Sequence, residues 1–406
     1  MSIISRVVSG ALVAGCLLSG LCFFGTIPVA QAQTRCPALH HRSLAPQPPD
    51  PNLLAAHRFS QGAGVKIAVI DTGVYPHPRL GEVIPGGDLV GNTNGLEDCD
   101  RHGTIVAGII AARPAPTEDS LLGVAPAAEI ISIRQTTKSG EDATGTLAGM
   151  AKAIEKALEH HAGVINLSVV ACLSPARAAT VDLGVLNTAL AHAEANNAVV
   201  VAAAGNRGQG CEPGDIVFPA HSNTVVGVAA LDPDGKHTDY SLSGPHLLAA
   251  PGHVPLGLSP LGDPRPVQGI QTNQGDQPWE GTSFAAPVIS GIAALLKERY
   301  PTETAAQLRQ RMYSAAWPAN GELDPLRALG HLPGPTTVED TETRSISLPA
   351  PQQQDPRPQQ RTAFLLVVVC GFVILGWLVN DASRSTGPED LTTPRSPNAR
   401  NHKPGR

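Results

Sequence analysis

Gly281-Thr282-Ser283-Phe284-Ala285-Ala286-Pro287 places a serine directly before a long apolar run. The run extends from Phe284 to Leu296 and contains many small residues, which predicts a helix that packs closely in a core. Pro287 is expected among the first four helical positions, whose N–H groups have no intrahelical partner. Ser283 is therefore expected at the N-terminus of a buried helix, where backbone donors suit a developing oxyanion. An N-cap serine on a structural helix is the alternative.

Two upstream blocks contain an aspartate and a histidine. Ile67-Ala68-Val69-Ile70-Asp71-Thr72-Gly73-Val74 is typical of a buried strand that ends in a carboxylate, and ligands of parallel sheets gather at such strand ends. His102-Gly103-Thr104 opens an apolar helical stretch from Ile105 to Ala112. The order Asp, His, Ser along the chain is that of subtilisin and differs from the orders in chymotrypsin and the α/β-hydrolases.

A fourth block makes the pattern specific. With Val199-Val200-Val201-Ala202-Ala203-Ala204-Gly205-Asn206, the chain resembles the subtilisin family in its four signature blocks and in their order. The resemblance implies a serine endopeptidase in which Ser283 is the nucleophile, His102 the general base and Asp71 the residue that orients the imidazole. It also implies that the Asn206 amide donates to the oxyanion; an asparagine in a simple turn is the alternative.

The substrate groove is expected to involve Ser168, Val169, Val170 and Gly205. The family often has glycines where this chain has the two valines. Valines there would narrow the groove, so we expect restricted specificity and slow turnover of generic peptides.

The segment from Val65 to Leu329 alternates apolar strands with helical patterns. This favours an α/β, subtilisin-like three-layer fold with a mostly parallel central sheet, and we place the protease domain at residues 61–330. The expected strands are Lys66 to Ile70, Glu129 to Ile133, Val164 to Leu167, Val199 to Ala203, Val225 to Ala229 and His246 to Ala250. The expected helices are Thr104 to Ala112, Leu147 to His160, Leu183 to Asn196, Ser283 to Tyr300 and Ala305 to Met312.

Length and charge limit the function classes. The chain has 406 residues and a formal net charge of −6. Its two ends have non-globular sequences, which leaves one core of about 270 residues, a possible size for a single domain. Neither the charge balance nor any basic patch indicates nucleic acid as a partner.

The N-terminal 60 residues predict an export signal and an extension. Residues 1–32 combine Arg6, an apolar stretch and Ala30-Gln31-Ala32, as expected of a secretory signal peptide cleaved after Ala32. Lipidation at Cys16 and an uncleaved anchor are the alternatives. Residues 33–60 are proline-rich, which argues against any regular element. The extension is too short for the pro-domain of secreted subtilisins, so we expect an arm lying on the catalytic domain, and the activation route is left open.

Four of the seven cysteines belong to the exported region. An even number in an exported domain predicts two disulfides, with three possible connectivities. We favour Cys36–Cys99, which would fasten the extension near His102, and Cys172–Cys211, because both cysteines follow strands expected to be neighbours.

Metal-ligand patterns are weak in this sequence. The adjacent pairs His40-His41 and His160-His161 lack ligand spacing. Asp98 and Asp100 flank Cys99 and are interpreted as an acidic surface loop. We assign no metal and no cofactor.

The C-terminal region predicts a membrane anchor. Residues 331–362 are rich in Pro, Gln, Thr and Glu and are typical of an extended linker. Residues 363–379 are uncharged and apolar, at the short end of the range for a transmembrane helix. Residues 380–406 are basic, which favours a cytoplasmic tail and an extracytoplasmic protease domain on a single-pass inner-membrane protein.

The complete layout, together with Phe284 in the serine block and the four exported cysteines, resembles the mycosins, the subtilisin-like proteases of actinobacterial type VII secretion systems. This resemblance implies protein substrates and a type VII secretion membrane complex as partners. Two alternatives are kept. An α/β-hydrolase would need Asp324 and His331 as partners of the serine, but these lie too close to the linker to leave room for the required strands. The second alternative is a membrane scaffold with a non-essential or inactive protease domain.

Overall fold

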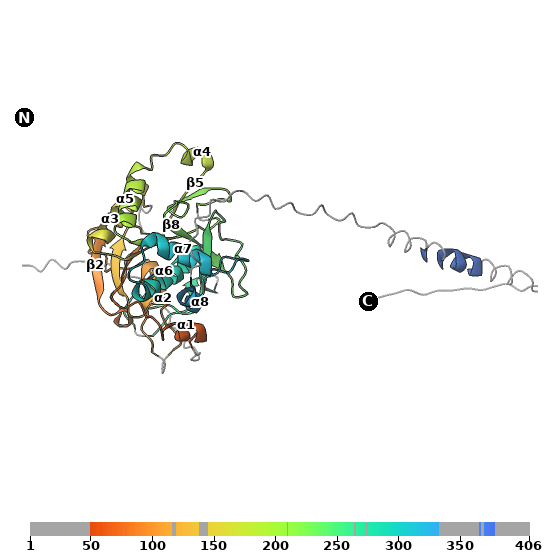
Figure 1. The fold of residues 1–406 in the computed structure, drawn as a ribbon, viewed down its shortest axis with the longest axis horizontal. Helices are drawn as coiled ribbons and strands as arrows, with labels where there is room; N and C mark the ends of the chain where they lie inside the picture. The colour runs from red at the N-terminus through yellow and green to blue at the C-terminus, as the bar shows by residue number, and fades with distance from the viewer. Residues whose placement is uncertain are drawn as a thin grey trace, which may run out of the picture. The chain divides into compact units, whose positions relative to one another are not determined.

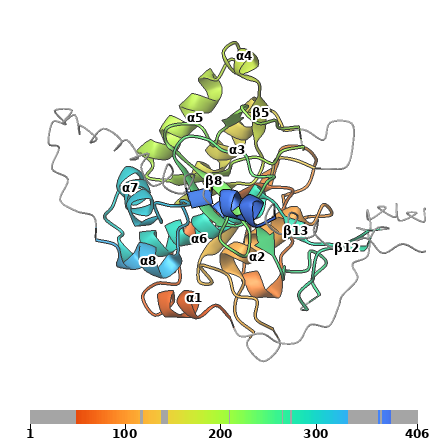
Figure 2. The ribbon, with the colours of Figure 1, turned by 90° about the vertical axis from the view of Figure 1, so that its right-hand side faces the viewer.

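The structure is a computed structural model of the chain and describes residues 49–115, 119–137, 145–208, 210–263, 265–272, 275–332, 365–366 and 369–377. It divides into two compact units, Met1–Pro335 and Thr336–Arg406, which are described separately. The first unit is built around a central sheet with helices on both faces (Figures 1 and 2).

The central sheet has seven strands in the order β2-β3-β1-β4-β6-β8-β9, and all neighbouring pairs are parallel. All six strands expected from the sequence belong to it. Its strands are β1 Lys66–Asp71, β2 Val83–Asp88, β3 Glu129–Arg134, β4 Val164–Leu167, β6 Val199–Ala203, β8 Val225–Leu231 and β9 Leu247–Pro251. Three two-stranded sheets pair β5 Ala171–Leu173 with β7 Ile216–Phe218, β10 His253–Val254 with β13 Trp279–Glu280, and β11 Ile270–Thr272 with β12 Gly275–Gln277.

Two helical layers cover the sheet. The helices are α1 Pro51–Ala56, α2 His102–Ala111, α3 Leu147–Glu159, α4 Pro175–Ala178, α5 Gly184–Ala195, α6 Thr282–Arg299, α7 Ala305–Ala315 and α8 Pro325–Gly330, with a 3₁₀ turn, η1, at Pro78–Leu80. In β1, Ile67 and Val69 belong to the buried cluster that includes α2 and α6, whereas Ala68 and Ile70 belong to the cluster that includes α3 and α5. Successive side chains of a strand point to opposite faces, so one apolar strand contributes to two cores. The predicted three-layer α/β fold is thereby confirmed.

Strand β2 was not among the predicted strands. Its sequence, Val83-Ile84-Pro85-Gly86-Gly87-Asp88, contains a proline and two glycines, and its register with β3 shifts between Pro85 and Gly87. A proline cannot donate to a sheet ladder, and it is tolerated at this position because β2 is the edge strand. The sheet therefore extends two strands beyond β1 on this side.

The position of Pro287 differs from the prediction. Helix α6 begins at Thr282, so Pro287 is its sixth residue and lies inside the helix rather than among the first four positions. A proline there has no N–H to donate to the carbonyl four residues earlier, which is the carbonyl of Ser283. The rest of the prediction for this segment holds, since α6 is buried along most of its length.

The N-terminal extension contains a helix that the prolines had argued against. Asp50 caps α1 by accepting a hydrogen bond from the N–H of Asn52 at 2.8 Å, and Pro51 occupies the first helical position, where its missing N–H costs nothing. The described part of the extension lies on the domain as expected. Leu53 and Ala56 are buried, and Glu298 of α6 accepts hydrogen bonds from Ser60 and the next three backbone N–H groups.

One predicted disulfide is present in the structure. Cys172 of β5 is bonded to Cys211, with their Cα atoms 5.2 Å apart. Cys99 is disulfide-bonded as well. Cys36, its expected partner, lies outside the described residues, so the Cys36–Cys99 pairing stays a prediction.

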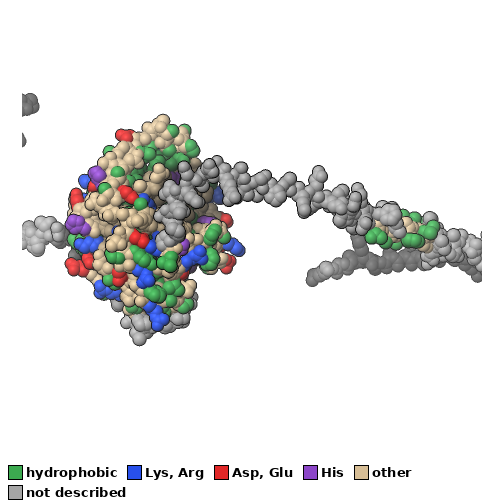
Figure 3. Space-filling model, viewed as in Figure 1, with side chains coloured by type: hydrophobic (Ala, Val, Ile, Leu, Met, Phe, Trp, Pro, Cys, Tyr) green, Lys and Arg blue, Asp and Glu red, His purple; other side chains and the backbone are tan. Residues whose placement is uncertain are grey.

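Other predictions concern segments that the structure describes only in part. The signal peptide at 1–32, most of the linker at 331–362 and the tail at 380–406 lie outside the described residues. Of the segment 363–379, residues 365–366 and 369–377 are described and are helical, and no helix among the described residues is long and apolar enough to cross a bilayer. On the face drawn in Figure 3, basic and acidic side chains are interspersed over the first unit.

Candidate active site

The predicted site residues gather at the carboxyl ends of three adjacent strands. Asp71 is the last residue of β1, Ser168 follows β4 directly, and Asn206 lies three residues after β6. The chain leaves β1 toward β2 and β3 on one side and later reaches β4 on the other. Ligands of open parallel sheets bind at such a switch point, outside the carboxyl ends of the strands.

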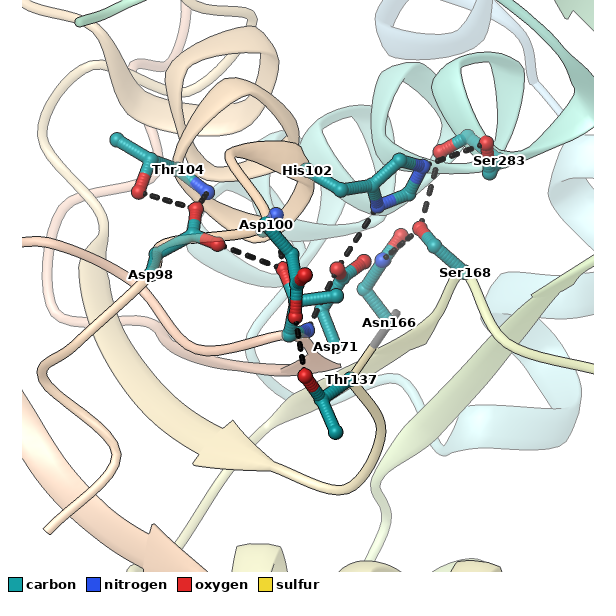
Figure 4. A network of polar contacts seen from close by, with 11 residues as sticks. Asp71, Asp98, Asp100, His102, Thr104, Thr137, Asn166, Ser168 and Ser283 are labelled. Atoms are coloured by element: carbon teal, nitrogen blue, oxygen red, sulfur yellow. Dashed lines mark hydrogen bonds and ion pairs between the residues drawn. The ribbon is translucent and has the colours of Figure 1, made fainter. Parts of the chain in front are cut away.

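Asp71, His102 and Ser283 form a hydrogen-bonded chain (Figure 4). His102 Nδ1 lies 2.8 Å from Asp71 Oδ1, and His102 Nε2 lies 2.8 Å from Ser283 Oγ. Asp71 is fully buried, and the His102 side chain is 16% exposed. A carboxylate can only accept, so the proton of the neutral imidazole is on Nδ1 and Nε2 accepts the serine hydroxyl. This is the arrangement in which the imidazole can take the hydroxyl proton.

Two neighbours fix the orientation of these groups. The backbone N–H of Thr72 donates to Asp71 Oδ1 at 2.7 Å, whereas Asp71 Oδ2 is buried and finds no donor among the described residues. The ring of Phe284 packs against the imidazole of His102, with centroids 4.8 Å apart and planes at 40°. The imidazole is therefore held between the carboxylate and an aromatic ring.

Asn206 is oriented as an oxyanion donor would be. Its Oδ1 accepts hydrogen bonds from the N–H of Thr282 at 2.9 Å and from the Thr282 hydroxyl at 3.0 Å, so Nδ2 must point the other way. A Cβ built on Gly281 would lie 3.1 Å from Asn206 Nδ2 and 3.2 Å from Ser283 Oγ. The glycine thus keeps open a point within reach of both the nucleophile and the amide donor, which is the space a reacting carbonyl needs.

Gly205 precedes this asparagine in a tightly enclosed position. Its φ is +93°, and a Cβ there would lie 3.3 Å from Cys172 Sγ and 3.4 Å from Cys211 Sγ. Its N–H donates to the Thr282 hydroxyl at 3.1 Å. The disulfide and the threonine together hold the backbone that leads into Asn206.

Ser168 supplies the donor that Pro287 lacks. Its hydroxyl donates to the carbonyl oxygen of Ser283 at 2.9 Å. Asn166 Nδ2 donates to Ser168 Oγ at 3.0 Å, and the hydroxyl of Ser290 donates to Asn166 Oδ1 at 2.8 Å. This buried relay connects β4 to α6 and positions the turn that contains the nucleophile.

Three buried polar residues that support the site were not predicted as site residues: Asn166 and Ser290 of the relay, and Thr282, which bonds Asn206 and Gly205. Asn166 and Ser290 are fully buried, and Thr282 is 1% exposed. Polar side chains inside otherwise apolar segments were the available signal, because buried polar groups need hydrogen-bond partners. The sequence does not show which partners these would be.

The groove residues Ser168, Val169, Val170 and Gly205 line a cleft of about 500 Å³ together with the triad and Asn206. Val169 and Val170 are half-buried. Other residues that line the cleft are Thr72, Asp100, Arg101, Thr136, Thr137, Ala203, Cys211, Pro278, Trp279, Glu280, Thr282 and Phe284. The cleft therefore has a mixed polar and apolar lining with acidic and basic groups.

The interpretation of Asp98 as part of an acidic surface loop is wrong. Asp98 is 2% exposed and hydrogen-bonded within the domain, whereas Asp100 is half-buried at the cleft. Burial and the nearby charge of Asp71 raise the pKa of Asp98 to about 6, although hydrogen bonds from Thr104 and Thr72 oppose the rise. Within the described ranges, no group of His, Cys, Asp and Glu side chains has the arrangement of a metal site.

Comparison with known proteins identifies the family. The model of the subtilase family matches residues 62–344. Mycosin-4 of Mycobacterium tuberculosis is 39% identical over 367 residues, which cover 82% of this chain and 80% of that protein. Mycosin-1 of the same organism is 37% identical over 370 residues, which cover 79% of this chain and 81% of that protein.

Solved structures agree with the sequence relatives. The crystal structure of MycP1 with its N-terminal propeptide removed is 37% identical, with a TM-score of 0.64 over 70% of this chain and 96% of that chain. A chain in the structure of an intact ESX-5 inner membrane complex is 31% identical, with a TM-score of 0.66 over 86% of this chain and all of that one. The chain belongs to the subtilase family of serine endopeptidases and, within that family, to the mycosins.

Proposed function

We propose that this protein hydrolyses peptide bonds of exported proteins through an acyl-enzyme on Ser283, at the extracytoplasmic side of a type VII secretion membrane complex. The observation that supports the hydrolytic part most directly is the open point beside Gly281, 3.1 Å from Asn206 Nδ2 and 3.2 Å from Ser283 Oγ. The nucleophile and the oxyanion donor both reach this space, and the base His102 is hydrogen-bonded to the nucleophile.

The residues have distinct roles in the proposed reaction. Ser283 Oγ attacks the carbonyl carbon while His102 Nε2 takes the hydroxyl proton and later gives it to the leaving amine. Asp71 keeps the imidazole proton on Nδ1 and stabilises the imidazolium. Asn206 Nδ2 and the N–H of Ser283 donate to the oxyanion, and water then releases the acyl group by the same steps in reverse.

Labelling with a fluorophosphonate probe tests the hydrolytic proposal. We expect the probe to modify Ser283 of the full-length chain, and peptide mapping after digestion locates the adduct. Ser283→Ala should abolish labelling and peptide hydrolysis while leaving the melting temperature nearly unchanged. Ser241, whose hydroxyl lies within bonding distance of Ala230 N–H, serves as the comparison serine; an adduct there would contradict the assignment.

The secretion-system role is supported by the relatives. The solved structures that match include MycP1 from the ESX-1 type VII secretion system and chains of the ESX-5 inner membrane complex. The apolar segment 363–379 and the basic tail 380–406 support an anchor with the catalytic domain outside. Protease added to intact spheroplasts should therefore remove the domain and spare a small C-terminal fragment; protection of the domain would contradict this topology.

A structural contribution to the complex is compatible with hydrolysis. The arm that packs on the domain and the C-terminal extension have no part in bond cleavage, and the matching chain of the ESX-5 complex lies within an assembly. We expect Ser283→Ala to abolish processing of an exported substrate but to preserve the assembled complex, whereas deletion of the whole chain removes both. Loss of the complex in the Ser283→Ala strain at normal protein levels would contradict the separate structural role.

The substrate groove supports restricted specificity. Val169 and Val170 line the cleft at positions where subtilisins often have glycine, and their side chains reduce the space for substrate. We expect slow cleavage of casein relative to a digestive subtilisin. Equal rates would contradict the restricted groove without affecting the assignment of Ser283.

A further inference from the structure

The loop before α2 contains a buried carboxyl group that the proposed reaction does not use. Asp98 Oδ1 accepts a hydrogen bond from the Thr72 hydroxyl at 2.8 Å. Asp98 Oδ2 accepts two more from Thr104, from its N–H at 2.7 Å and from its hydroxyl at 2.6 Å (Figure 4). A carboxylate at 2% exposure thus receives three donors, all within 2.8 Å.

These three bonds connect the two elements that contain Asp71 and His102. Thr72 follows Asp71 at the end of β1, and Thr104 lies two residues after His102 in the first turn of α2. The Thr72 hydroxyl also accepts the N–H of Gly103 at 3.0 Å. The Asp98 carboxylate and the Thr72–Gly103 bond therefore hold the strand end against the helix start, and with them the separation of Asp71 from His102.

Helix α2 relies on the Asp98 carboxylate for capping, because the side chain of its own N-cap residue accepts no hydrogen bond from the helix. Arg101 occupies the N-cap with φ +69°, and its side chain makes no capping hydrogen bond. The N–H groups of Gly103 and Thr104, which have no intrahelical acceptor, are bonded instead to the Thr72 hydroxyl and to Asp98. The carboxylate also lies at the positive end of the helix dipole.

Capping alone does not explain a buried charge at this position. Serine, threonine and asparagine cap helices about as well as aspartate, and they do so without placing a second carboxylate near buried Asp71. The charged groups of the described chain that interact with Asp98 are Asp71 from β1 and Arg101 from the loop. A neutral acid would have to orient its own proton toward one of three donors, so it could not accept all three bonds.

We propose that Asp98 is a positioning residue of the catalytic triad, whose ionised carboxylate holds Asp71 and His102 in register through Thr72 and Thr104. The proposal rests on the proposed hydrolytic function of Ser283. Asp98 does not touch the substrate. Its contribution is to prevent the small displacement of His102 that would lengthen the bonds to Asp71 and Ser283.

The test compares Asp98→Asn with Glu97→Gln, a neighbouring loss of one charge at an exposed side chain. The readouts are the second-order rate of fluorophosphonate labelling of the full-length chain, and kcat and KM for a tetrapeptide para-nitroanilide. At pH 8 we expect Asp98→Asn to lower the labelling rate and kcat about 10- to 100-fold with little change in KM, since a displacement of about 1 Å can cost on the order of 10²-fold. Glu97→Gln should match the wild type.

The pH dependence separates positioning from mere folding. The ratio of wild-type to Asp98→Asn rates should be constant at alkaline pH and fall toward one below about pH 6. The wild-type carboxyl is protonated there, so residue 98 is neutral in both chains. A ratio that does not change with pH, or equal rates at pH 8, would overturn the proposal.

A second variant allows the proposal to be tested even if Asp98→Asn does not fold. Thr72→Val retains the Asp98 charge but removes one of its three donors, together with the acceptor of the Gly103 N–H, and we expect labelling to slow about tenfold. An unchanged labelling rate in folded Thr72→Val would overturn the proposal. If Ser283 of the wild-type chain is not labelled at all, the proposed function fails; normal wild-type labelling that is insensitive to Asp98→Asn contradicts only the positioning role.

Discussion

The two sides of the catalytic triad are held by different chemistry. On the His102 side, the ionisable carboxyl of Asp98 joins β1 to α2 through three hydrogen bonds. On the Ser283 side, the neutral side chains of Ser168, Asn166 and Ser290 join β4 to α6. Both sets of supporting residues are buried, so their polar groups must find hydrogen-bond partners inside the domain.

This difference predicts which side responds to pH. Protonation changes the hydrogen-bonding capacity of a carboxyl group but leaves amides and hydroxyls unaffected across the physiological range. Acid should therefore loosen the His102 side while the Ser283 side keeps its geometry. The following predictions test that contrast, beginning with the largest effect.

Asn206→Ala should give the largest loss among these variants. Removal of the amide donor is expected to lower kcat about 10²- to 10³-fold, the range known for the oxyanion asparagine of subtilisin itself, with little effect on KM. Steady-state kinetics with the tetrapeptide para-nitroanilide measures both constants. Because the lost group is neutral, the ratio of wild-type to variant kcat should not vary between pH 5 and 8; a ratio that falls in acid, as expected for Asp98→Asn, would remove the contrast.

Ser168→Ala should weaken the Ser283 side through the fold. It removes the hydroxyl that donates to the buried carbonyl of Ser283, which is expected to cost about 1–3 kcal/mol of unfolding free energy. Pro287→Ala restores an N–H four residues after that carbonyl, so the double variant should recover about 1 kcal/mol relative to Ser168→Ala. Urea denaturation of the wild type, both single variants and the double variant closes the cycle. Additive losses would show that the hydroxyl does not replace the missing helical bond.

Asp98 should make stability depend on pH in the opposite direction from a carboxyl whose pKa is lowered by folding. The folded-state pKa of Asp98 is raised from 3.8 to about 6, so the folded state binds more protons than the unfolded state between these values. The free energy of unfolding therefore rises as the pH falls through this window, relative to Asp98→Asn. Urea denaturation of the two chains at pH 4, 5, 6 and 7 measures the difference. The contributions of Asp98 to stability and to activity, each measured as wild type relative to Asp98→Asn, should thus change in opposite directions with pH, and a parallel decline of the two would contradict the assigned ionisation.

Glu298→Gln should have the smallest effect on catalysis. Burial raises the pKa of Glu298, but hydrogen bonds from Ser60 and the N–H groups of residues 61–63 outweigh it and lower the pKa overall. With a lowered folded-state pKa, this carboxylate stabilises the arm at neutral pH and loses that contribution as the pH falls through its folded value. Hydrogen exchange of residues 61–63 should quicken in the variant while kcat stays within about twofold. A loss of kcat as large as that of Asp98→Asn would show that charge removal alone disturbs the site.

The sequence determined the chemistry of the site and most of the sheet. Asp71 could be placed at a strand end and Ser283 at a helix start because apolar runs with abrupt polar ends specify local structure directly. The order of the blocks then gave the family, and the parallel strands followed from their continuous apolar sequences. These features depend on neighbouring residues in the chain, so they are visible without coordinates.

Only the tertiary structure decided how the site is supported. Asp98 looked like part of a surface loop because its sequence neighbours are polar, yet Thr72 and Thr104 enclose it from β1 and α2. Pro287 could be identified as the sixth residue of α6 only once the start of that helix was known. The hydroxyl of Ser168, 119 positions earlier in the sequence, donates to the carbonyl that the missing N–H of Pro287 would have bonded. Hydrogen-bond partners that are distant in sequence meet only after the sheet has formed, and local patterns contain no information about which buried polar groups will meet.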